Sequence, residues 1–203
     1  QNTETLRNFT AFIDLGEGRR IYKPENPSIG TGNPGAPAFN QANLLFDNLN
    51  GNPAFRPFDT GSGAIESNLG LTRGIDFEQV NGARKLAPTE YQFNRELGYI
   101  SLSRRLQNDE VLAVSFEYTY NGQVYKVGEL SEDYQNRPIS DLIFLKMLRP
   151  ARINIRIPTW DLMMKNVYNL NANQIKQDGF QLQVIYRDDR TGLDNPTLLE
   201  GEN

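Results

Sequence analysis

Short stretches of alternating apolar and polar residues run along much of the chain. In residues 9–15, the apolar side chains of Phe9, Ala11, Ile13 and Leu15 share one side of an extended backbone. Because successive side chains of a strand point to opposite faces, this period of two predicts a half-buried β-strand. The same pattern predicts further strands at 75–80, 91–93, 99–102, 111–120, 123–127, 153–157 and 180–186.

The stretch 142–148 has a different pattern, because its residues are almost continuously apolar. A strand that is covered on both faces has no polar side and shows such a run. The sequence therefore predicts a central strand here.

Two pairs of predicted strands are joined by recognisable turns. Asn121-Gly122 separates 111–120 from 123–127, and both turn residues tolerate the positive φ of a two-residue hairpin. The register that follows has compatible cross-strand partners on both faces, namely Tyr118 with Tyr125, Phe116 with Val127, and Glu117 with Lys126. The linker 94–98 suits a type I turn closed by a left-handed Gly98.

Two short helices are predicted between the strands. Asn40 suits the N-cap of the first, which runs to Leu49, with Phe39 and Leu44 at the positions of a hydrophobic staple. Thr159 suits the N-cap of the second, whose inner stripe holds Trp160, Met163, Met164 and Val167.

Pro and Gly concentrate in residues 23–40 and 50–64, which are predicted to be long irregular loops. Many half-buried strands with two short helices indicate a mainly β chain. We therefore expect one β-rich domain over 1–203, with the architecture of an antiparallel β-sandwich.

Composition excludes several classes of function. The chain has neither histidine nor cysteine, so thiolate metal sites, a cysteine nucleophile and the commonest general base are absent. A net charge of −4 argues against nucleic acid as a partner. No apolar run approaches the length of a membrane-spanning helix. The chain begins and ends abruptly, so we expect it to be a soluble segment of a longer polypeptide.

Acidic residues gather at two places. Asp76 and Glu78 lie two residues apart in a predicted strand, where they form either a glycosidase pair or an ordinary solvated face. The turn with Asp188, Asp189, Asp194 and Asn195 is rich in oxygen ligands, but it lacks the spacing of a known calcium loop. A solvated strand face and a polar turn are the favoured interpretations, and we expect no metal and no cofactor.

Four aromatic residues, Tyr118, Tyr120, Tyr125 and Trp160, are the candidates for an interaction surface. Exposed in a groove, they would form a stacking surface for sugars, as in a carbohydrate-binding β-sandwich module. The tyrosines also suit packing beneath a hairpin, and Trp160 suits an anchor for its helix. Both interpretations stay open at this point.

Three stretches together resemble the SprA (Sov) family of gliding-motility and secretion proteins. They are FIDLGEGRRIYKP at 12–24, the run 83–129, and PTWDLMMKNVY at 158–168. Within the second stretch, the similarity is strongest in TEYQFN at 89–94, LGYISL at 97–102, DEVLAV at 109–114 and EYTYNG at 117–122. The similarity extends over nearly the whole chain and is weakest in the Pro/Gly loops.

The resemblance implies a role rather than a catalytic site. Members of this family are giant outer-membrane β-barrels that form the translocon of the type IX secretion system. It implies that this chain is a non-catalytic segment of such a protein in the cell envelope, itself not membrane-spanning. Its expected partners are the remainder of the translocon chain, other secretion components and secreted proteins in transit. The resemblance supplies no catalytic or ligand-binding residue.

Overall fold

The computed structural model describes residues 6–164, 174–176, 178–183, 185–187 and 189–195. They belong to two compact units, Gln1–Met164 and Lys165–Asn203, which divide the single domain expected over 1–203. Each unit is considered by itself. No helix in the described residues is long and apolar enough to cross a membrane.

The first unit is built on a four-stranded sheet with the order β2-β1-β8-β5. Its strands are β1 (Arg7–Phe12), β2 (Phe77–Ala83), β5 (Leu112–Val114) and β8 (Leu142–Arg149). β1 pairs antiparallel with β2 but parallel with β8. The expected antiparallel sandwich is therefore wrong for this unit, whose central sheet is mixed. Strand residues outnumber helical ones, and the structure as a whole is mixed α and β.

The two central strands, β1 and β8, are buried on both faces, as the apolar run 142–148 predicted. On one face, Phe12 and Phe144 meet Phe77 of β2 and the apolar side of two helices. On the other face, Phe9 and Ile143 belong to a second cluster, with Ala11, Ile13, Met147 and Ile157. β1 alternates as predicted, but its second face is covered as well, because helices pack over it.

The helical layer differs from the prediction for 40–64. The first predicted helix is split into a 3-10 turn, Asn40–Ala42 (η1), and the helix α1, Leu45–Gly51. Asn40 is not an N-cap, because its side chain hydrogen-bonds to the backbone of Gly128. The expected staple is also absent, since Leu44 is 53% exposed. Residues 23–39 are irregular, as expected.

The second expected loop, 50–64, is instead largely helical. It contains a 3-10 turn, Pro53–Phe55 (η2), and the first half of α2, Phe58–Leu69. Pro57 precedes the helix, where its fixed φ and missing N–H do no harm. Gly61 is buried against the turn, since a Cβ there would lie 2.6 Å from the Phe55 carbonyl oxygen and 2.9 Å from Leu142 Cδ1. This glycine marks a close approach between α2 and its neighbours rather than a loop.

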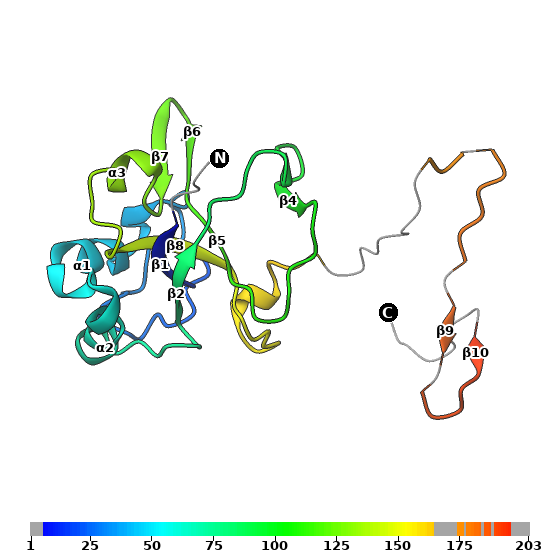
Figure 1. The fold of residues 1–203 in the computed structure, drawn as a ribbon, viewed down its shortest axis with the longest axis horizontal. Coiled ribbons are helices and arrows are strands. Elements are labelled where there is room, and N and C mark those ends of the chain that lie inside the picture. Colours follow the sequence, from blue (N-terminus) through cyan, green and yellow to red (C-terminus); the bar gives the residue numbers. More distant parts are fainter. Residues whose placement is uncertain (1–5, 165–173, 177, 184, 188, 196–203) are drawn as a thin grey trace. The chain divides into compact units, whose positions relative to one another are not determined.

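Two hairpins lie outside the central sheet: the second follows its predicted register, and the first has the left-handed Gly98 predicted in its turn. β3 (Tyr91–Asn94) pairs with β4 (Tyr99–Leu102), and Gly98 adopts a φ of 66°. β6 (Phe116–Tyr120) pairs with β7 (Gln123–Val127), with Tyr118 opposite Tyr125. The hairpin β6–β7 and strand β4 project away from the central sheet and its helices (Figure 1). The expected continuous strand 111–120 is interrupted at Ser115, where the chain leaves the central sheet.

Two predictions near residue 160 are wrong. Residues 153–157 form no strand, and Ile153 and Ile155 are exposed. The second predicted helix is only a 3-10 turn, Pro158–Trp160 (η3), in which Thr159 is buried but is not the N-cap. Met164 is 52% exposed, so no inner stripe forms over the described residues, and Val167 lies outside them. One further short helix, α3, comprises Ser131–Tyr134.

The second unit contains two paired strands of two residues, β9 (Tyr186–Arg187) and β10 (Asp194–Asn195). The strand predicted at 180–186 is thus confined to its end. Phe180 and Leu182 are exposed, and Val184 lies outside the described residues.

A buried ion pair connects the helices of the first unit to its sheet. Arg56 Nη1 and Nη2 donate to Glu129 Oε2 and Oε1 at 2.7 and 2.8 Å. The guanidinium also donates to the Leu142 carbonyl and to Asn50 Oδ1, and it lies 3.8 Å from the centre of the Phe144 ring. Glu129 Oε2 accepts the backbone N–H of Phe144 at 2.8 Å. The pair therefore joins α1, η2 and β8 at one point.

The two glycines of α2 allow a matched test of its packing. At Gly63 an added Cβ would meet nothing within 4 Å. Gly63→Ala should raise the free energy of unfolding by about 0.5–1 kcal/mol through helix propensity. Gly61→Ala should lower it by about 1–3 kcal/mol, because the methyl group collides with the η2 backbone. Urea unfolding measures both, and a stabilised Gly61→Ala variant would contradict the close packing.

The buried ion pair makes a second prediction. Glu129→Gln leaves Arg56 buried without its counter-charge, so the free energy of unfolding should fall by about 3–5 kcal/mol. The control is Glu132→Gln, which removes a charge from an exposed, loose pair with Lys126, whose atoms lie 3.8 Å apart, and should have little effect. Equal effects of the two variants in urea unfolding would show that the Arg56–Glu129 pair has no special role.

Candidate interaction surface

The tyrosines of the β6–β7 hairpin form an aromatic stack. The rings of Tyr118 and Tyr125 lie 5.5 Å apart with an interplanar angle of 25°. Phe39, from the loop before η1, contacts Tyr125 edge-on at 5.5 Å. The Tyr118 hydroxyl donates to the Ala38 carbonyl at 2.6 Å. The stack thus fastens the hairpin to the 23–39 loop.

The four predicted aromatic residues do not share one site. The rings of Tyr118 and Tyr125 stack on each other, and both side chains are half-buried. Tyr120 extends from the same face of β6 and is 54% exposed. Trp160 is half-buried in η3, a turn that packs against β8. The sugar-stacking arrangement therefore lacks its shared surface, and Phe39 is the partner that the sequence pattern did not reveal.

The β3–β4 hairpin carries an apolar face that the described residues leave uncovered. Its register pairs Tyr91 with Leu102 and Phe93 with Ile100, which places these four side chains on one face. Phe93 is 57% exposed and Ile100 is 37% exposed. The turn adds Leu97, which is 74% exposed. The alternating pattern predicted both strands, but it does not reveal whether a strand's apolar face is covered.

Two ion pairs stiffen the loops at the base of this hairpin. Arg84 donates to both carboxylate oxygens of Glu90, whose Oε2 also accepts the Ala87 N–H at 2.9 Å. These hydrogen bonds lower the pKa of Glu90 to about 2. Arg104 forms a similar pair with Glu110, which lowers the pKa of that carboxyl group. The loops on both sides of the hairpin are therefore held in place by ion pairs and hydrogen bonds.

The two acidic residues proposed as a glycosidase pair have separate partners. Asp76 precedes β2 and is buried, with Oδ2 accepting from Lys23 Nζ at 2.6 Å and from the Thr72 N–H at 2.7 Å. Glu78 is half-buried, and burial raises its pKa. Asp76 is thus committed to an ion pair that ties the 23–39 loop to the start of β2.

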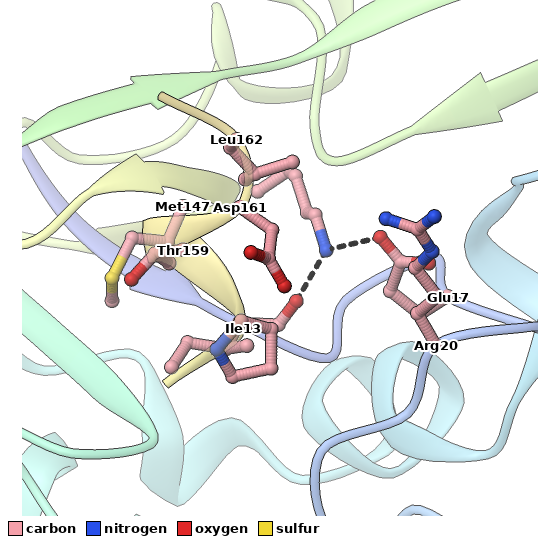
Figure 2. Close-up of a pocket in the computed structure, with 9 residues that line it drawn as sticks. Ile13, Glu17, Arg20, Met147, Thr159, Asp161 and Leu162 are labelled. Carbon is pink, nitrogen blue, oxygen red and sulfur yellow. Dashed lines mark hydrogen bonds and ion pairs between the residues drawn. The ribbon is translucent and has the colours of Figure 1, made fainter. Parts of the chain in front are cut away.

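A small cavity lies where the end of β1 meets β8 and η3. The Lys146 ammonium donates to the Ile13 carbonyl oxygen and, at 2.7 Å, to Glu17 Oε1. Figure 2 shows Ile13 and Glu17 among the residues that line the cavity, with these hydrogen bonds as dashed lines. Burial lowers the pKa of Lys146, whereas the Glu17 charge opposes that change. The cavity measures about 40 Å³. Small-molecule sites are roughly 300–1,000 Å³, so this space suits a water molecule rather than a substrate.

The acidic turn of the second unit is an ion pair rather than a ligand cluster. Arg187 Nε and Nη2 donate to Asp194 at 2.6 and 3.0 Å. Asp189 is exposed, and Asp188 lies outside the described residues. Within the described part of the chain, no three acidic residues are grouped to hold a metal ion.

Neither the comparison with protein-family models nor the comparison with curated proteins finds a match for this chain. The candidate surface is therefore defined by its geometry alone. It comprises the β3–β4 face, on which Phe93 and Ile100 are exposed and Tyr91 and Leu102 are half-buried, and the outer part of the β6–β7 hairpin around Tyr120.

The aromatic stack predicts unequal effects of two hydroxyl deletions. Tyr118→Phe keeps the ring but removes the hydrogen bond to Ala38, and it should lower the free energy of unfolding by about 1 kcal/mol. Tyr125→Phe removes only an exposed bond to Gln123 on the same strand and should change it less. Urea unfolding compares the two, and a larger effect of Tyr125→Phe would contradict the fastening role of Tyr118.

Proposed function

We propose that this chain is a non-catalytic structural and interaction segment of an outer-membrane translocon of the type IX secretion system. Its place is the cell envelope, as part of a protein of the SprA (Sov) kind. It contacts the remainder of that protein, other secretion components or secreted proteins in transit through its hairpins. The β3–β4 face, with Phe93 and Ile100 exposed, is the observation that carries the proposal.

The resemblance supports this proposal through the positions of its motifs. TEYQFN at 89–94 and LGYISL at 97–102 coincide with the β3–β4 hairpin, and EYTYNG at 117–122 coincides with β6 and its turn. Three of the four segments of strongest similarity thus fall on hairpins that project from the central sheet, and the fourth, DEVLAV at 109–114, contains its short strand β5. Projecting elements of this kind are the ones through which a segment contacts its surroundings.

The uncovered apolar face supports an interaction role on physical grounds. A two-stranded hairpin is marginally stable in water unless a hydrophobic face packs against something. Here the apolar face of β3–β4 is open, although its register and base are well defined. Exposed apolar surface bordered by charged residues marks protein contacts. Covering Phe93 and Ile100 would contribute about 0.5–1.5 kcal/mol per side chain, because they are 57% and 37% exposed and full burial contributes about 1.5–3 kcal/mol.

The ion pairs of the buried charged residues support the non-catalytic part of the proposal. General acid–base chemistry needs a titratable group in reach of a substrate. Asp76 and Lys146 are instead buried and paired, with Lys23 and Glu17 respectively, and the cavity beside Lys146 is too small for a substrate. A carbohydrate-binding module is less well supported, because Tyr118 and Tyr125 stack on each other.

The proposal predicts that the two faces of one hairpin differ in importance. Phe93→Thr combined with Ile100→Thr replaces the apolar face, and it should reduce secretion of proteins with a type IX sorting domain. Phe93 and Ile100 would be buried on docking, so their loss should weaken the affinity by about tenfold or more, since a tenfold change in affinity corresponds to about 1.4 kcal/mol. Secretion would be measured in cells whose translocon carries the variant, at matched protein level.

The control places the same residue on the opposite face of the same strands. Gln92→Thr with Ser101→Thr keeps the apolar face and introduces the same β-branched side chains, so secretion should stay normal. Normal secretion with the Phe93/Ile100 variant, or equal loss with both variants, would contradict the proposed role of this face.

A further inference from the structure

The sequence Asn-Gly occurs three times in the chain, at Asn50-Gly51, Asn81-Gly82 and Asn121-Gly122. An asparagine side chain followed by glycine can cyclise, because the glycine N–H is unhindered and can attack the amide carbon. Whether it does so in a folded protein depends on the backbone at that point. The structure places the three pairs in different environments, which makes them comparable within one molecule.

Two of the three pairs are held in unreactive arrangements. Asn50-Gly51 ends the helix α1, and Asn50 Oδ1 accepts a hydrogen bond from Arg56 Nη2 at 2.8 Å. Asn81-Gly82 lies within β2, where the Gly82 N–H donates to Asn8 Oδ1 at 2.9 Å. Helical backbone geometry and an engaged N–H each hold the attacking nitrogen away from its target.

Asn121-Gly122 is different in position and in backbone geometry. Both residues are exposed at the tip of β6–β7, and a Cβ added at Gly122 would meet nothing within 4 Å. Their φ values of 51° and 77° are both positive, as in a type I′ turn.

A flip of the peptide between the two turn residues creates the geometry for cyclisation. Type II′, the other favoured hairpin turn, has φ near +60° and ψ near −120° at its first central residue. Asn121 already has a suitable φ, so only the peptide between the two turn residues must rotate. Gly122 permits this, because glycine accepts the negative φ of the new turn as readily as the positive one. The rotation brings the Gly122 nitrogen beside the Asn121 side-chain carbon.

We propose that Asn121 is a site of spontaneous deamidation, through a succinimide formed within the hairpin turn. The Gly122 nitrogen loses its proton to hydroxide and bonds to Asn121 Cγ. The Cγ–Nδ2 bond breaks, and ammonia leaves with a proton taken from water. Water then opens the five-membered ring at either of its carbonyl carbons and yields aspartate or isoaspartate at position 121.

The modification acts on the candidate surface. Both products add a negative charge beside Tyr120, and isoaspartate also adds one atom to the backbone of a two-residue turn. A longer turn no longer matches the register that places Tyr118 opposite Tyr125. Isoaspartate at the tip therefore loosens the aromatic stack that fastens this hairpin to the 23–39 loop.

The test is incubation of the whole chain at mildly alkaline pH, followed by peptide mapping with mass spectrometry and an isoaspartate assay. We expect ammonia loss at Asn121 at least about tenfold faster than at Asn50 or Asn81, a difference that needs about 1.4 kcal/mol in barrier height. In concentrated urea the three rates should converge, because the folded environments are gone. The variant Asn121→Gly keeps a turn-compatible pair and should abolish the reaction at the tip.

Four results would overturn the proposal. In the folded chain, Asn50 or Asn81 could react as fast as Asn121, or Asn121 could stay unchanged. Aspartate without isoaspartate would show direct hydrolysis instead of ring formation. If Asn121 still reacted faster than Asn50 and Asn81 in urea, the turn geometry would not be the cause of its faster reaction.

Discussion

One charged contact, between Arg56 and Glu129, holds the first unit together. A guanidinium and a carboxylate are both withdrawn from water, so each must have its hydrogen-bonding groups satisfied by the protein. That demand is met by Asn50, the Leu142 carbonyl and the Phe144 N–H, which come from α1 and β8. Such a pair contributes less to net stability than to uniqueness, because alternative packings would leave a charge buried alone. The ion pair therefore favours one packing of the helices on the sheet over the alternatives.

Away from this contact, the stability of the chain is uneven. β1 and β8 are covered on both faces, whereas β3–β4 has an open apolar face. β6–β7 is intermediate, because its aromatic stack reaches Phe39 and Ala38 while Tyr120 stays exposed. The free energy of local unfolding should therefore decrease from β1 and β8 through β6–β7 to β3–β4, since local unfolding starts where few apolar contacts are buried. Elements of low intrinsic stability that keep a defined register are suited to dock onto a partner and gain their stability there.

The contrast between local and distant constraints explains what the sequence could predict. Asn121-Gly122 and Gly98 act within a few residues, so the β6–β7 register and the left-handed Gly98 of the β3–β4 turn were predicted correctly. The parallel pairing of β1 with β8 and the Arg56–Glu129 contact connect residues far apart in the chain, and no local pattern signals them. α2 was missed because Gly61 resembles a loop residue until its contact with Phe55 is known. The uncovered β3–β4 face was missed for the same reason, since burial depends on what the rest of the fold covers.

The central claim is that a rigid core presents hairpins that are completed by docking. Hydrogen exchange of the backbone amides tests it most directly, measured on this chain alone and within the translocon that we propose it belongs to. The account predicts slow exchange in β1 and β8 in both samples. It predicts fast exchange in residues 91–102 of the chain alone and marked slowing of the same residues in the assembly. Exchange in 91–102 that is already as slow as in β8, or that assembly does not slow, would contradict the account.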